Sequence, residues 1–246
     1  MCVATVLLET GIVEMKEPET KLVFEAPGGL IEIVAVCRDG KAESITFRNL
    51  PSYADALNAQ IEVPGVGTLS VDTAWGGDSY VLVDGRQLGF SISPDEARDI
   101  AEMGIRTTNA ANEQLGFVHP SNGWDHISFC QITHPAQHIN GMLTGRATIS
   151  LQPGKLDRSP SGTGTSARMS ILHARGELKL GERYTGISIT ETQFEGLVSE
   201  VIDLHGKRAI RPVITGKAWI NGIQQHFLDP TDPFPEGYRV SDVNQH

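Results

Sequence analysis

The sequence predicts an α+β protein, because strand-like and helix-like segments follow one another in separate blocks. Strand-like runs come early, at 21–25, 30–36, 42–48, 68–74 and 79–83. Two helical segments lie in the middle of the chain, each followed by further strand-like runs. Such an order favours a largely antiparallel sheet with helices packed on it over a doubly wound parallel sheet.

The N-terminal third is expected to consist of one helix and a group of strands. The helix covers residues 2–10, has no capping residue, and would end at Gly11. The Asp-Gly pair at 39–40 is typical of a tight hairpin turn. Between residues 51 and 67 the alternation loosens, and the Pro-Gly pair at 64–65 indicates a boundary or a change of sheet.

The two central helices have recognisable start signals. Ser93, Pro94 and Glu96 form a capping box with proline at the first helical position. A Gly/Ser/Thr-rich segment at 157–166 opens the second helix, which would run to about Ala174. The remaining strands are expected at 127–132, 146–151, 186–190, 195–204, 210–215 and 217–220.

Composition and charge exclude several classes of protein. With 246 residues, 39% of them hydrophobic and 20% charged, the chain has the composition of a globular protein of one large domain or two lobes. The net charge of −10 repels nucleic acids and anionic membranes, so neither is an expected partner. No run reaches the roughly 20 apolar residues of a membrane span.

The cysteines and histidines indicate neither disulfides nor a metal site. The three cysteines, Cys2, Cys37 and Cys130, form no CxxC pair and are expected to be reduced thiols in a cytoplasmic protein. The histidines between residues 119 and 138 have no metal-ligand spacing and are interpreted as polar loop residues.

The segment 157–168, DRSPSGTGTSAR, carries the clearest chemical signal. A glycine-rich turn that opens a helix leaves backbone N–H groups free to bind a small anion, such as a carboxylate. Ser161 would hold its hydroxyl beside that anion, and Asp157 could accept a hydrogen bond from an ammonium group. The alternative is ordinary helix capping without any ligand. The segment matches neither nucleotide-binding glycine motif.

This segment resembles the second active-site motif of the proline racemase family, DRSPCGTGTSA. The runs LLETGIV, FEAPGG, VDTAWGGDSYVLVD and GKAWINGIQQHFLDPTDPFPEGYRVSD resemble the same family in the same order. The resemblance implies a diaminopimelate-epimerase-like fold of two α+β lobes, each a mostly antiparallel sheet around a central helix. Family members use no cofactor, act on proline and hydroxyprolines, and are often homodimers.

The resemblance also implies roles for four residues. Asp157 would accept a hydrogen bond from the ring nitrogen of the substrate, although it is equally suited to stabilising the helix N-terminus. Gly162 and Thr163 would donate backbone N–H groups to the substrate carboxylate. Ser161 stands where racemases and 4-hydroxyproline epimerases carry their second catalytic cysteine.

Ser161 favours one branch of the family. A serine hydroxyl is a poor base for an α-proton, and the family's 3-hydroxyproline dehydratases carry a hydroxyl residue here. We therefore expect a trans-3-hydroxy-L-proline dehydratase that forms pyrroline-2-carboxylate, with 4-hydroxyproline 2-epimerase or proline racemase as the alternative.

The family's first motif, MCGHG or MSGSN, is expected just before the first helix, and the chain begins inside that helix. We interpret this as N-terminal truncation with an incomplete first lobe, and Cys2 as a buried helix residue. Residues 1–62 would belong to the first lobe, with 234–246 returning to it, and 63–233 to the second. A truncated remnant that only binds a small amino acid is the alternative of another class.

Overall fold

The computed structural model describes residues 1–26 and 29–237. Its helices in these ranges are α1 (Cys2–Glu9), α2 (Ala97–Gln114) and α3 (Gly162–Ala174), with short 3-10 turns η1 (Gly85–Leu88) and η2 (Pro94–Glu96). Its strands are β1 (Glu19–Ala26), β2 (Gly29–Arg38), β3 (Lys41–Arg48), β4 (Ser52–Val63), β5 (Gly67–Trp75), β6 (Ser79–Asp84), β7 (Phe129–Thr133), β8 (Gln137–Ile139), β9 (Met142–Leu151), β10 (Lys155–Leu156), β11 (Arg183–Ile187), β12 (Gln193–Leu204) and β13 (Lys207–Gly216).

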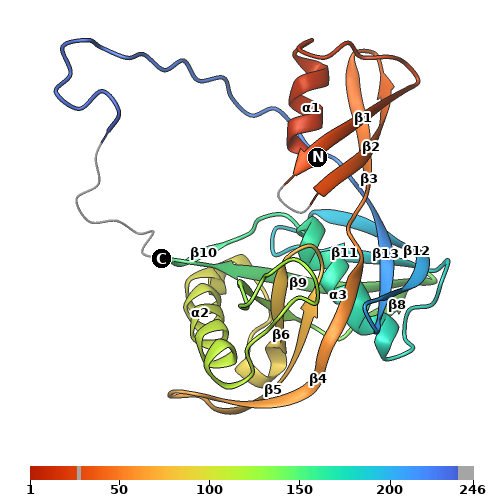
Figure 1. Cartoon of the computed structure of the whole chain (residues 1–246), viewed down its shortest axis with the longest axis vertical. Coiled ribbons are helices and arrows are strands. Elements are labelled where there is room, and N and C mark those ends of the chain that lie inside the picture. The colour runs from red at the N-terminus through yellow and green to blue at the C-terminus, as the bar shows by residue number, and fades with distance from the viewer. Residues whose placement is uncertain (27–28, 238–246) are drawn as a thin grey trace.

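The strands form one continuous sheet in the order β1-β2-β3-β13-β12-β11-β9-β7-β6-β5-β4. The pairs β6–β7 and β9–β11 are parallel, and the other pairs are antiparallel. A further pairing joins β4 to β13 and closes the strands from β4 onward into a ring. Figure 1 shows this ring below the smaller part made by α1 and β1–β3. The predicted α+β class is confirmed.

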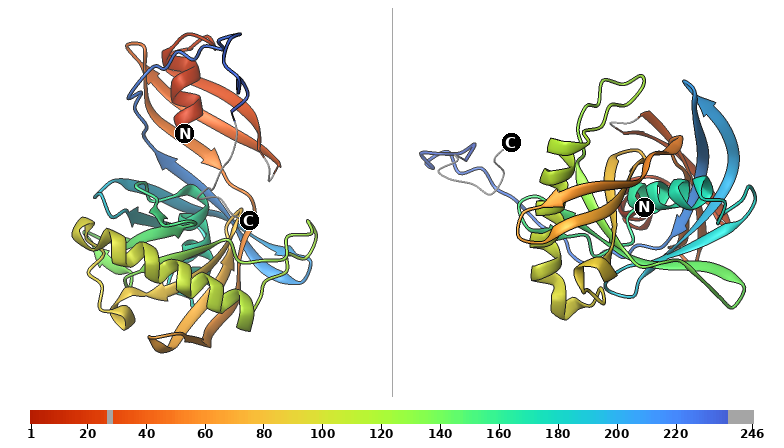
Figure 2. Two further views of the ribbon diagram at one scale, coloured as in Figure 1. Left: turned by 90° about the vertical axis from the view of Figure 1, so that its left-hand side faces the viewer. Right: turned by 90° about the horizontal axis from the view of Figure 1, so that it is seen from below.

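Helix α3 runs through the middle of the ring. It packs against β4, β5, β6, β12 and β13, and every residue from Gly164 to Leu172 is buried. The view from below shows α3 among the strands (Figure 2). A helix that is buried all round has no polar face, and α3 accordingly carries small and apolar residues around most of its circumference, with Arg168 as the charged exception. The ring therefore holds the N-terminus of α3 in a fixed place.

Helix α2 covers the outside of the ring, where it packs on β7 and β9. The close approach requires a glycine, because a Cβ atom added at Gly104 would overlap the Ser150 side chain. The predicted capping box is present at its start, where the Glu96 carboxylate accepts the Ser93 N–H group at 2.9 Å. No helix in the described ranges is long and apolar enough to cross a membrane.

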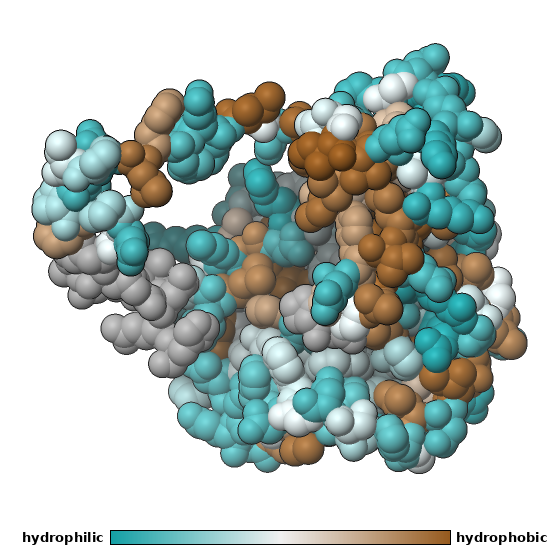
Figure 3. All heavy atoms as spheres, turned by 45° about the horizontal axis from the view of Figure 1, so that its top comes forward, coloured by the Kyte–Doolittle hydropathy of each residue, from teal (hydrophilic) through white to brown (hydrophobic). Residues whose placement is uncertain are grey.

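The smaller part joins α1 to the three-stranded sheet β1–β3. Ala4 and Leu8 of α1 pack on Ile33, Ala35 and Ile45 of the sheet. β3 also pairs with β13, a strand of the ring, so the two parts share one sheet. Apolar side chains also lie exposed on this part, and Figure 3 shows them among the polar ones. The exposed ones include Val3, Val6, Val23 and Leu30.

Two predicted elements differ from the structure. The segment predicted to loosen after residue 51 is the long strand β4, whose register shifts twice, between Ala54 and Ala56 and between Ala56 and Ala59. These bulges, together with Asn58 at φ 54°, interrupt the alternation of inward and outward side chains and so hide the strand in the sequence. The strand predicted at 217–220 is wrong, because β13 ends at Gly216 and irregular chain follows.

The predicted division into lobes at residue 62 stays a prediction. β4 pairs with β5 and β13, and therefore lies with residues that we assigned to the second lobe. Residues 217–237 contain no helix or strand and run out as a long loop (Figure 1). The predicted return of 234–246 to the first lobe falls largely on 238–246, which lie outside the described residues.

Candidate active site

The N-terminus of α3 presents two free backbone donors. The Ser161 Oγ atom accepts the Gly164 N–H group at 3.1 Å and so caps the helix. Within the described residues, the N–H groups of Gly162 and Thr163 have no acceptor. These two groups lie at the positive end of the helix dipole, where a carboxylate binds well. The structure thus brings together the residues that the glycine-rich segment singled out.

Ser161 has an unusual backbone conformation, with φ 61° and ψ 132°. A non-glycine residue rarely adopts a positive φ, and such strain is often found at functional sites. Hydrogen bonds hold the residue in place: its N–H group donates to Ser159 Oγ at 3.1 Å, and its carbonyl accepts the Thr165 N–H group at 3.1 Å. This backbone conformation directs the Ser161 hydroxyl toward the N-terminus of α3, where it accepts the Gly164 N–H group.

Asp157 supports the turn from one side. Its Oδ1 atom accepts the N–H group and the hydroxyl of Ser159, each at 2.9 Å. Both bonds use the same oxygen, so Oδ2 has no hydrogen bond within the described part of the chain. Asp157 therefore both shapes the turn and keeps one carboxylate oxygen available.

A buried tyrosine contacts the same helix end. Tyr80 on β6 is hydrogen bonded to Thr163, with 2.6 Å between the two hydroxyl oxygens. Burial raises the pKa of Tyr80, so the phenol stays neutral and can donate or accept this bond. The Thr163 hydroxyl is in turn 3.5 Å from Ser161 Oγ. Among the described residues, no carboxylate or imidazole is hydrogen bonded to Ser161 Oγ.

The loop after β5 packs directly on α3. Gly76 is buried, and its carbonyl accepts a hydrogen bond at 2.9 Å from the side-chain amide of Asn49. The same amide donates to Ser166 Oγ on α3 at 2.8 Å. A Cβ atom at Gly76 would overlap the Thr163 carbonyl oxygen and lie 2.5 Å from the Ala167 nitrogen. Asn49 and Gly76 thus set the position of the α3 N-terminus.

A cavity of about 750 Å³ opens between the N-termini of α1 and α3. Its charged lining residues are Arg158 and Lys217, and no acidic residue lines it. The field inside therefore favours an anion. Of the predicted site residues, Gly162 lines this cavity, whereas Asp157, Ser161 and Thr163 do not. The remaining lining residues are Met1, Cys2, Phe47, Ser159, Thr190, Thr192, Gln193, Phe194, Ala218 and Trp219.

Cys2 is exposed at the first position of α1 and lines this cavity, so the prediction that it is buried is wrong. The helix presents its first turn to the cavity, and the apolar contacts with β1–β3 fall on Ala4 and Leu8 instead. Cys37 and Cys130 are buried, and burial raises the pKa of the Cys130 thiol.

The thiols are therefore expected to differ in reactivity. At pH 8 an aromatic disulfide reagent should titrate one thiol of the folded chain rapidly and all three after denaturation, because the thiolate is the reactive form and needs access. The variant Cys2→Ser should lose the rapid phase. Rapid reaction of even one thiol in the native Cys2→Ser chain would contradict the assigned burial.

The turn at 157–163 is evident in the sequence, whereas the residues that support it are not. Asn49 and Tyr80 come from distant segments, and although Tyr80 lies in the VDTAWGGDSYVLVD run, neither residue was singled out. Phe47 is another supporting residue from a distant segment, since a Cβ atom at Gly162 would lie 2.8 Å from its ring. The only signal in the sequence is the pair of glycines in the VDTAWGGDSYVLVD run, since glycine in a strand region often marks a close approach of two backbone segments.

The fold and this site define an α+β protein with two free backbone donors at a helix N-terminus beside a cationic cavity. The model of the family described as proline racemase matches residues 1–239, and the chain belongs to that family. The resemblance found in the sequence is thereby confirmed. The family includes racemases and epimerases, which supports assignment of the chain to an enzyme family.

Two solved structures are similar over nearly the whole chain. A probable proline racemase from Agrobacterium radiobacter, with bound carbonate, is 36% identical with a TM-score of 0.88 over 98% of this chain and 70% of that one. A hydroxyproline epimerase from Agrobacterium vitis, with bound trans-4-hydroxy-L-proline, is 38% identical with a TM-score of 0.89 over 98% and 69%. A phenazine biosynthesis protein from Bacillus anthracis, 12% identical with a TM-score of 0.51 over 87% and 69%, shares the fold alone.

Proposed function

We propose that the chain acts at the α-carbon of a proline-type amino acid, and that its reaction is the dehydration of trans-3-hydroxy-L-proline to pyrroline-2-carboxylate. The observation that carries the proposal is Ser161, a hydroxyl held at the anion-binding end of α3 where family racemases have a thiol. A cytoplasmic location, a homodimer and the absence of a cofactor remain predictions.

The proposed binding mode follows from the free polar groups at the turn. The substrate carboxylate would accept the N–H groups of Gly162 and Thr163, which have no other acceptor within the described residues. The protonated ring nitrogen would donate to Oδ2 of Asp157. A carboxylate and an ammonium group that are both bonded to the α-carbon of an amino acid match this arrangement.

The chemistry of Ser161 suits elimination better than racemisation. Racemisation requires groups that remove and return the α-proton on opposite faces, whereas elimination requires removal on one face. In the elimination, a base takes the α-proton, the electron pair of the broken C–H bond forms the ring double bond, and the 3-hydroxyl takes up a proton and departs as water, so that one water is lost overall. A neutral hydroxyl can donate a hydrogen bond to that leaving group, but a serine without a neighbouring base is a weak proton acceptor.

Epimerisation is the second candidate. The similar protein from Agrobacterium vitis is a hydroxyproline epimerase and holds trans-4-hydroxy-L-proline. The cationic cavity beside Gly162 would accept a hydroxyproline of either kind. The two activities differ in whether the α-proton is returned.

Proton NMR in D₂O distinguishes these candidates. The purified chain is incubated separately with trans-3-hydroxy-L-proline, trans-4-hydroxy-L-proline and L-proline. We expect pyrroline-2-carboxylate from the first substrate and no change in the other two. Loss of the α-proton signal without elimination would replace the dehydratase by an epimerase or racemase. Unchanged spectra with all three substrates would contradict catalysis and would favour the alternative that the chain only binds a small amino acid.

Asp157→Asn is expected to weaken substrate binding by about 10- to 100-fold, because the amide keeps the contact with Ser159 but removes the charge that pairs with the ring nitrogen. Calorimetric titration with trans-3-hydroxy-L-proline would measure the dissociation constant. The control is Asp95→Asn, an exposed carboxylate in the turn before α2, which should leave affinity unchanged. Equal affinities of both variants would remove Asp157 from the substrate site.

A further inference from the structure

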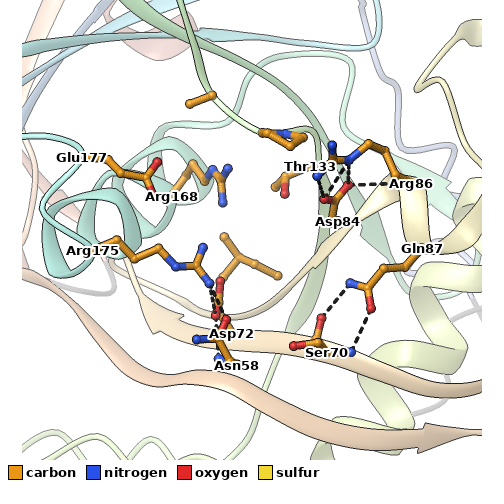
Figure 4. A pocket seen from close by; sticks show the side chains of 13 residues that line it. Asn58, Ser70, Asp72, Asp84, Arg86, Gln87, Thr133, Arg168, Arg175 and Glu177 are labelled. Atoms are coloured by element: carbon orange, nitrogen blue, oxygen red, sulfur yellow. Dashed lines mark hydrogen bonds and ion pairs between the residues drawn. The ribbon is translucent and has the colours of Figure 1, made fainter.

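A second cavity, of about 280 Å³, lies toward the other end of α3. Arg168 of α3, Arg175 at its C-terminus and Asp72 of β5 line one side, and Asp84 of β6 and Thr133 of β7 line the other. Figure 4 shows these side chains pointing toward a common space. Arg168 follows Gly162 by six residues, about 9 Å along the helix axis, and none of the residues lining the first cavity lines this one.

Arg168 is a buried cation without a counter-ion. The residue is 6% exposed, and its guanidinium points into the cavity (Figure 4). One terminal nitrogen donates to the His134 carbonyl at 3.2 Å, while Nε has no hydrogen-bond partner within the described residues. None of the ion pairs in that part of the chain includes Arg168. The side chain also interacts with the neutral hydroxyl of the buried Tyr184. Burial of a charge without a counter-ion is costly, so an anionic group beside Arg168 would be stabilising.

The other charges of the cavity neutralise one another. Arg175 pairs with Asp72 at 2.8 Å, and Arg86 pairs with Asp84 at 2.6 Å. Glu177 remains, an exposed carboxylate with no ion pair or side-chain hydrogen bond in the described ranges. The cavity thus contains one unpaired cation and one unpaired anion, which Figure 4 shows on the same side.

We infer that this cavity binds a free α-amino acid with a small polar side chain. The ligand carboxylate would pair with the Arg168 guanidinium, which is suited to bidentate contact, and the ammonium group would pair with Glu177. The hydroxyl of Thr133 would face the side chain. Three arginines and three carboxylates line the cavity, so its formal charge is balanced and a zwitterion fits better than phosphate.

This site is independent of the proposed reaction, since it uses neither the free N–H groups of α3 nor Asp157. The full chain is titrated calorimetrically with L-serine and, in parallel, with acetate, ethanolamine and inorganic phosphate. We expect L-serine to bind, and the other three to bind at least about tenfold more weakly, because each lacks one of the two charges or carries too much negative charge.

Two variants test the assigned contacts. Glu177→Gln changes an exposed residue and should weaken L-serine binding by about tenfold, and Arg168→Gln should abolish it. Glu113→Gln, an exposed carboxylate on α2, is the matched control and should bind normally. Asp157→Asn should also bind L-serine normally, which separates this cavity from the turn at 157–163.

Three results would overturn the inference: no heat with L-serine, phosphate or acetate binding as tightly as L-serine, or binding lost in Asp157→Asn but retained in Glu177→Gln. The second result would make the cavity a simple anion site. The third would place the amino acid at the N-terminus of α3. Because Glu177→Gln alters a solvent-exposed residue, these results do not depend on whether Arg168→Gln folds.

Discussion

Replacing Gly76 by alanine is expected to lower the free energy of unfolding by about 3 kcal/mol or more, the upper part of the range for overpacked cores. The added Cβ atom would overlap the Thr163 carbonyl oxygen and crowd the Ala167 nitrogen, and both are backbone atoms of a helix that is buried all round. Neither can move without shifting the whole of α3. The strain would therefore fall on the helix end that holds Ser161.

Thermal unfolding of the full chain measures this effect. For a protein of this length, the expected loss corresponds to a fall in Tm of about 6–12 °C. Gly222→Ala is the matched control, because an added Cβ atom there has nothing within 4 Å and no unfavourable φ. If Gly76→Ala and Gly222→Ala unfold at the same temperature, the packing of the loop after β5 on α3 is not as described.

Ser161→Ala is expected to reduce kcat for trans-3-hydroxy-L-proline by about 100-fold or more, the range for loss of an acid–base group. The substitution removes the hydroxyl proposed to assist departure of the 3-hydroxyl. It also removes a helix cap, the bond from the Gly164 N–H group, which contributes about 1 kcal/mol of stability. The loss of activity should greatly exceed any effect of that destabilisation at 25 °C.

Two further variants separate the chemical role of Ser161 from its capping role. Ser93→Ala removes a polar side chain from the turn before α2 and should leave kcat unchanged. Ser161→Cys supplies a thiol of much lower pKa than a hydroxyl, and should increase exchange of the substrate α-proton with D₂O relative to elimination. NMR in D₂O follows both processes in one sample. Full elimination activity in Ser161→Ala would exclude the proposed role.

Much of the site was predictable because it is local in sequence. The turn at 157–163 places its own hydrogen-bond partners two or three residues apart, as in the bonds from Ser159 to Asp157 and from Gly164 to Ser161. Such contacts depend on residue type and spacing, which a sequence states directly. The α+β class was predictable for the same reason, because most strands alternate in the expected period.

The residues that hold the site in place were not predictable from the sequence. Asn49 reaches α3 from the connection between β3 and β4, and Tyr80 reaches it from β6. The two contacts span 117 and 83 residues of sequence, respectively. β4 itself was missed because its bulges interrupt the alternation of side chains. Contacts of this kind follow from how the strands pair.

The sequence by itself determined the family, the α+β class and the polar turn that opens α3, since each depends on neighbouring residues. Only the tertiary structure decided how α3 is used. Closure of the ring by β4 and β13 buries the helix on every side, so its N-terminus faces one cavity and its C-terminal half another. Arg168 belongs to the same twelve-residue motif as Ser161, yet burial leaves its charge unpaired, because packing rather than residue order determines which groups meet.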